Sequence, residues 1–96
     1  GPDDKDTLII VTYDEFGGQW DHVPPPTGAG VADIWGPGTR IPALIVSKKF
    51  TRSGVDHTAY DTTSILTTIE KRFKLSPLTS RDAAVSSLTP ALKRIH

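Results

Sequence analysis

The fold of this chain is decided by the stretch TLIIVTYDE at residues 7–15. Its centre is β-branched and continuously apolar, so residues 7–13 predict a strand with both faces covered. Residues 41–47 have the same character, and their proline falls early, where a missing backbone donor is tolerated. Two such strands favour an α/β fold. Two acidic residues follow the first strand directly, at the end of a strand where open α/β sheets bind ligands.

Helical segments are predicted after the second strand. Residues 61–73 have the apolar spacing of a helix, with Asp61 as the expected N-cap. Residues 79–82 resemble a capping box, and Thr89-Pro90 can start one further turn. The face of the first helix that is expected to pack inward holds Ile65, Leu66, Ile69 and Phe73.

Length and composition exclude several classes of protein. The chain has 96 residues, and eleven Lys and Arg balance eleven Asp and Glu, so the formal net charge is zero. This balance argues against a nucleic-acid partner, because dedicated nucleic-acid binders carry a basic excess. The absence of cysteine excludes disulfide scaffolds and thiolate metal sites. The longest apolar run, at residues 8–11, is far too short for a transmembrane segment.

Ten of the sixteen Gly and Pro residues lie between Asp14 and Arg40, which predicts one long irregular loop. Asp14 and Glu15 open this loop, and adjacent carboxylates repel each other unless a cation or a proton offsets their charge. Asp21 and His22 then return oxygen and nitrogen ligands suited to Mg, Ca, Mn or Zn. The alternative is that these side chains are turn formers, with Asp14 capping its own turn.

The loop sequence DEFGGQWDHVPPP at residues 14–26 closely resembles the C-terminal part of the bacterial phosphoesterase family. That family contains non-specific phospholipases C and acid phosphatases and belongs to the alkaline phosphatase superfamily. The resemblance continues through residues 36–47, 55–66 and 78–84 with matching order and spacing. Many family members carry His where this chain has Thr62, and we assign no catalytic role to that position.

The resemblance implies a fragment of an alkaline-phosphatase-like α/β/α sandwich. About two core strands, a long Gly/Pro-rich loop and one or two covering helices are expected. Residues 1–4 are interpreted as a tag remnant or linker, since Gly1-Pro2 is what a common protease leaves behind, and residues 5–96 as the C-terminal portion of a phosphoesterase domain.

The resemblance also implies a metal site and a reaction. In the family a divalent metal activates a Ser or Thr nucleophile that attacks phosphorus, so Asp14 and Glu15 carry over as metal ligands. His22 carries over as a candidate ligand or phosphate contact. The family's Glu-Asn pair and its nucleophile have no match in this chain. We therefore expect no catalytic residue here, and a chain that is inactive alone.

The expected parent is a hydrolase that takes a phosphoester substrate and needs a divalent metal ion, either Ca, Mg, Mn or Zn. Because the family is often exported, a secreted, periplasmic or cell-envelope parent is implied. The alternative is a stand-alone binding module or a structural fragment without catalysis. An isolated piece would expose a strand edge and an apolar face, and we expect it to self-associate near Leu8, Ile10, Leu44 and Val46.

Overall fold

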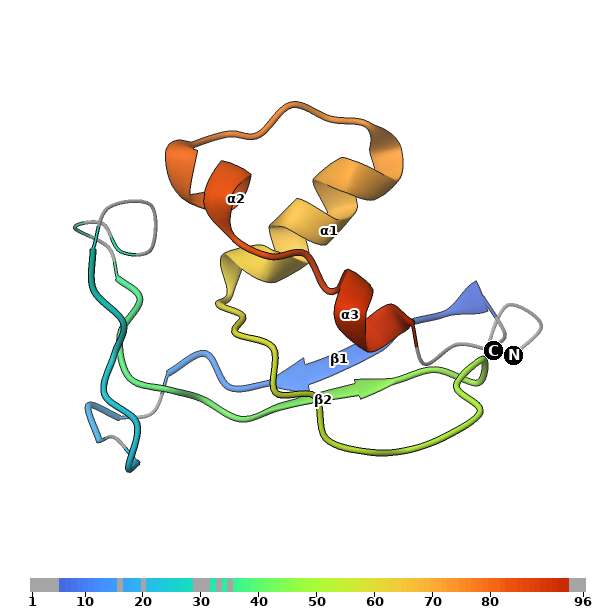
Figure 1. Ribbon diagram of the computed structural model, residues 1–96, viewed down its shortest axis with the longest axis horizontal. Helices are drawn as coiled ribbons and strands as arrows, with labels where there is room; N and C mark the ends of the chain where they lie inside the picture. The colour runs from blue at the N-terminus through green and yellow to red at the C-terminus, as the bar shows by residue number, and fades with distance from the viewer. Residues whose placement is uncertain are drawn as a thin grey trace.

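A computed structural model of the chain describes residues 6–15, 17–19, 21–28, 32, 34 and 36–93. The elements, in chain order, are β1 (Ile9–Thr12), β2 (Ala43–Val46), α1 (Thr63–Phe73), α2 (Ser80–Ala84) and α3 (Thr89–Leu92). The chain is a small α/β unit with a Cα radius of gyration of 14.4 Å. The helices lie on one side of the sheet, and the loop between the strands extends beyond its end (Figure 1). The interpretation of residues 1–4 concerns residues outside the described part.

The two predicted strands form an antiparallel pair. Ile9 pairs with Val46, and Thr12 pairs with Ala43. The Thr12 hydroxyl donates to the Pro42 carbonyl at 2.8 Å, which prolongs the contact beyond the last pair. Both strands are shorter than predicted, since the pairing runs only from Ile9–Val46 to Thr12–Ala43. The α/β class is confirmed by these elements.

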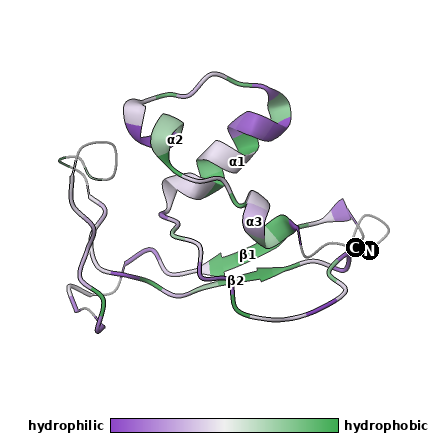
Figure 2. Cartoon of the chain, in the orientation of Figure 1, coloured by the Kyte–Doolittle hydropathy of each residue, from purple (hydrophilic) through white to green (hydrophobic). Residues whose placement is uncertain are grey.

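The expectation that both strand faces are covered is wrong for the described residues, whereas the exposed apolar face expected of an isolated piece is present. One face carries the cross-strand pairs Ile9–Val46 and Val11–Leu44, whose four side chains are between 42% and 59% exposed. Ile10 is half-buried and points to the opposite face. The four residues expected to mediate self-association therefore do not lie on one face of the sheet. Leu8 and Ile10 lie on the face opposite to Leu44 and Val46. The apolar strands are evident in Figure 2.

Helix α1 begins two residues later than predicted, and its N-cap is Thr62 rather than Asp61, although the Asp61 carboxylate does accept from an early amide as expected. The Asp61 carboxylate accepts from the Thr63 backbone N–H at 2.6 Å and from the Thr63 hydroxyl. In return, the Asp61 N–H donates to the Ser64 hydroxyl at 3.1 Å. This reciprocal arrangement satisfies donors that the first turn of a helix leaves without partners.

The capping box before α2 is also confirmed. The Thr79 N–H donates to Asp82 Oδ1 at 2.7 Å, and the Thr79 hydroxyl donates to the same oxygen at 2.5 Å. Proline lies at the start of α3, as expected for the first helical turn. The buried apolar side chains among the described residues are Leu88 and Ala91, which places the small core between the helices.

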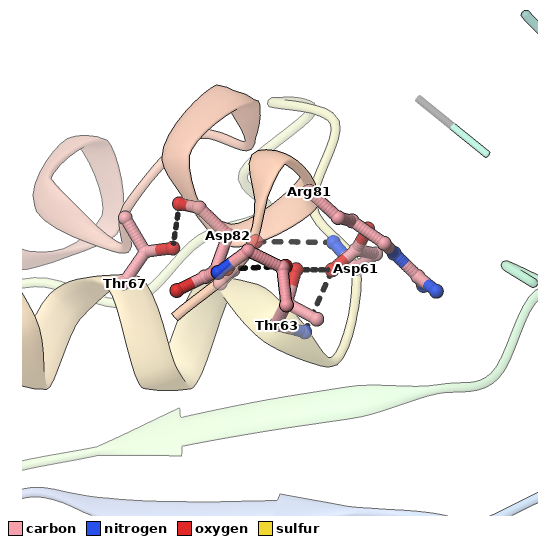
Figure 3. Close-up of polar contacts among 7 residues, drawn as sticks. Asp61, Thr63, Thr67, Arg81 and Asp82 are labelled. Atoms are coloured by element: carbon pink, nitrogen blue, oxygen red, sulfur yellow. Dashed lines mark hydrogen bonds and ion pairs between the residues drawn. The ribbon is translucent and has the colours of Figure 1, made fainter. Parts of the chain in front are cut away.

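The face of α1 that packs inward was predicted wrongly. Its buried residues are Ser64, Thr67 and Glu70, whereas the predicted Ile65 and Leu66 are only half-buried and Ile69 and Phe73 are 45% and 64% exposed. The reason is that α2 covers the polar stripe. The Thr67 hydroxyl donates to the Asp82 carbonyl of α2 at 2.7 Å (Figure 3). Polar bonds, which apolar periodicity does not register, orient this helix.

Candidate functional site

Asp14 and Glu15 lie at the carboxyl end of β1 and are exposed. Asp14 Oδ1 accepts a hydrogen bond from the backbone N–H of Glu15 at 2.9 Å. Gly17 and Gly18 follow with φ angles of 62° and 74°, a left-handed conformation that glycine adopts without the penalty a side chain would bring. The chain thus turns sharply just after the acidic pair and leaves both carboxylates near the surface.

Asp21 has a different role from the one its spacing suggested. Its Oδ2 pairs with Arg40, at 2.6 Å to Nη2 and 2.7 Å to Nε, and its Oδ1 accepts from the Val23 N–H at 2.9 Å. The Val23 N–H, and next to it the Arg40 guanidinium, lower the pKa of Asp21 below its usual 3.8. The pair joins the loop to the residues before β2. Sequence reasoning missed Arg40 because its partner lies nineteen positions away.

His22 is exposed and lies directly after this ion pair. No three His, Asp or Glu side chains among the described residues come together in a way that could hold a metal ion. The acidic pair nevertheless fits a hard divalent cation by chemistry, because such ions prefer carboxylate oxygens. Even if both bind through two oxygens each, two carboxylates supply fewer than the six or more oxygens that calcium takes. The ligand roles of Asp14, Glu15 and His22 therefore remain predictions.

A second polar contact joins the segment before α1 to α2, close to the end of the long loop. Arg81 Nε lies 3.2 Å from Asp61 Oδ2, and both side chains are largely buried (Figure 3). A Cβ placed on Gly36 would lie 3.1 Å from the Gly38 nitrogen and 3.8 Å from Arg81 Nη1. Arg81 therefore reaches from α2 to both the start of α1 and the end of the long loop. No pattern in the sequence signalled this contact.

The chain belongs to the phosphoesterase family. The model of that family, described as "Phosphoesterase family", matches residues 1–76. The family expected from the loop sequence is thereby confirmed.

Two relatives illustrate the match. Phospholipase C B of Mycobacterium tuberculosis is 34% identical in an alignment 106 positions long. The alignment covers 86% of this chain and 20% of the relative. Non-specific phospholipase C6 of Arabidopsis thaliana is 35% identical over 104 residues, covering 85% of this chain and 20% of the relative. The chain thus spans about a fifth of the length of these relatives. No solved structure matches the chain. Among the helices of the described part, none has the length and apolar character that crossing a bilayer requires.

Proposed function

We propose that this chain is the C-terminal segment of a longer, metal-dependent phosphoester hydrolase of the phospholipase C or acid phosphatase type. The observation that carries the proposal is the family match over residues 1–76, which includes the acidic pair after β1. The named relatives are phospholipases C, and they are about five times as long as the part that this chain matches. The rest of the catalytic machinery would then come from outside this chain.

Within that enzyme, Asp14 and Glu15 would supply part of the metal site. Their exposed position at the carboxyl end of β1 supports this role, since a ligand can approach them there. A divalent ion bound there would polarise a phosphoryl oxygen and stabilise charge that develops in the transition state. His22 would bind the metal or contact the phosphate, and the Asp21–Arg40 pair would hold the backbone beside it.

The second candidate function is a binding module or self-associating structural fragment without catalysis. The exposed apolar face of the sheet favours it, since its four side chains at Ile9, Val11, Leu44 and Val46 form one continuous patch. Such a face usually marks a contact with another protein surface. The same face would also be covered in a longer enzyme, so catalysis must be tested directly.

The test is Asp14→Asn in the longer protein, with hydrolysis of p-nitrophenyl phosphate and phosphatidylcholine followed against metal concentration. Asn keeps the size and one acceptor oxygen but loses the charge that balances a cation. We expect activity to fall by about a hundredfold or more, as when a transition-state stabilising group is removed, and to recover in part at high metal concentration.

The matched control is Asp6→Asn, which removes an exposed carboxylate that pairs with Lys49 at 2.9 Å. It should leave activity unchanged. Near-normal turnover of the Asp14→Asn protein, with an unchanged melting temperature, would contradict the metal role of this residue. The 96-residue chain alone should hydrolyse neither substrate faster than buffer containing the same metals. Turnover abolished by replacing a Ser or Thr of this chain would show that the nucleophile lies within it.

A further inference from the structure

Glu70 is a buried carboxyl group for which the function proposed above has no use. It is only 4% exposed, and neither of its carboxyl oxygens has a conventional hydrogen-bond partner. It lies on α1 one turn after Thr67, whose hydroxyl contacts α2. A carboxylate buried without compensation is very unfavourable, and such groups take up a proton instead.

Asp82 lies on α2, across the Thr67 contact from α1. Unlike Glu70, it has a carboxylate that accepts several hydrogen bonds. Its carboxylate accepts from the Thr79 hydroxyl at 2.5 Å, the Leu78 N–H at 2.7 Å and the Thr79 N–H at 2.7 Å. The Thr79 hydroxyl, with these backbone donors and Glu70 adding to it, holds the pKa of Asp82 far below its usual 3.8. Asp82 is therefore ionised, and a carboxylate has capacity for about four hydrogen bonds, so it can accept one more.

The other charged groups near the helix contact do not neutralise this pair. Arg81, next to Asp82 on α2, is directed to Asp61 at 3.2 Å. Residues 75–79, which connect the two helices, contain no ionisable side chain. Burial, and after it the neighbouring Asp82 carboxylate, raises the pKa of Glu70 above its usual 4.5. The remaining cations of the helical region are exposed at Lys71, Arg72, Lys74 and Lys93.

We propose that Glu70 retains a proton and shares it with the Asp82 carboxylate, so that the contact between α1 and α2 is a proton-dependent joint. The Glu70 carboxyl O–H donates to Asp82, and the pair carries a single negative charge. When the proton leaves to solvent, two buried carboxylates face each other and the contact weakens. This proposal concerns the helices alone and does not depend on the metal site.

The direction of the pH effect follows from the two pKa shifts. Glu70 has a raised pKa, so its contribution is fully present below about pH 4.5 and is lost as pH rises through its folded value. Asp82 has a lowered pKa, so its contribution is present above pH 3.8 and is lost as pH falls further. The helix pair should therefore be most stable in mild acid. Between 4.5 and the raised pKa of Glu70, each pH unit changes the folding equilibrium by at most about tenfold.

The experiment has two readouts on the 96-residue chain: a carbon-13 titration of the Glu70 carboxyl and thermal unfolding from about pH 4 to about pH 8. We expect Glu70 to titrate above 4.5 and the melting temperature to fall as pH rises. In the Glu70→Gln variant the amide donates to Asp82 at every pH, so this fall should disappear. The control Asp6→Asn should keep the fall of the wild-type chain.

Three outcomes would overturn the proposal. The first is a Glu70 carboxyl that titrates at or below 4.5. The second is a Glu70→Gln variant whose melting temperature still falls with pH as in the wild type. The third is a chain with no cooperative unfolding transition at any pH, because no helix contact would then exist for a proton to control.

Discussion

Replacing Thr68 by Val tests the polar packing between the helices in its simplest form. The Thr68 hydroxyl donates to the Ser64 carbonyl at 2.7 Å and accepts from the Leu88 N–H at 2.9 Å. Leu88 is only 5% exposed and precedes α3 directly, so this hydroxyl joins α1 to α3. Valine has nearly the same shape but no hydroxyl, and it would leave a buried backbone donor without its partner.

Losing the partner of a buried hydrogen-bonding group costs about 1–3 kcal/mol, most of it desolvation that is no longer compensated. For a domain of this size each kcal/mol lowers the melting temperature by about 4–8 °C. We therefore expect Thr68→Val to melt at least about 4 °C below the wild-type chain in circular dichroism.

Two variants control for side-chain shape and for the chemistry of the substitution. Thr68→Ser keeps the hydroxyl and should retain most of the stability. Thr62→Val makes the same substitution at an exposed position that forms no capping bond, and it should change the melting temperature little. Equal melting of Thr68→Val and wild type would refute the reasoning that polar bonds hold these helices together.

Two further predictions concern the sheet and the loop. The chain should form dimers or larger species through the exposed face of the sheet, since exposed apolar patches of this kind usually become buried against another protein surface. Val11→Lys should shift the mass measured by light scattering toward the monomer, and a monomer of the unmodified chain at high concentration would contradict this. For the loop, the Asp21–Arg40 pair should persist in NMR spectra as pH falls past 3.8, because the pKa of Asp21 is lowered and its stabilisation is lost only below that value. Breakage of the pair above 3.8 would show that Arg40 and Val23 do not hold this carboxylate.

The strands and helices of this fold could be predicted from local sequence, because apolar runs and helix-capping residues mark them. Two apolar runs became strands, and the capping box at Thr79 and Asp82 marked the start of α2. The orientation of α1 could not be predicted, because Thr67, in the polar stripe that α1 buries, bonds to the Asp82 carbonyl fifteen positions away, and the neighbouring Thr68 bonds to Leu88 twenty positions away. Apolar periodicity assumes that the apolar face is the buried one, and that assumption failed here.

The acidic residues of the candidate site also differ in ways that local sequence did not show, and the difference bears on their function. By residue type and spacing alone Asp14 and Asp21 were both candidate ligands, but Asp21 is held by an arginine and a backbone donor, whereas the bond seen for Asp14 is to its own neighbour. A carboxylate that already accepts from an arginine and a backbone donor is a poorer candidate for a metal, since a cation would compete with those donors. Asp21 is therefore better understood as a residue that fixes the loop, and a ligand role for Asp14 with Glu15 stays a prediction. The spacing alone gave no means to separate these roles, because Arg40 comes close to Asp21 only when the loop returns to β2.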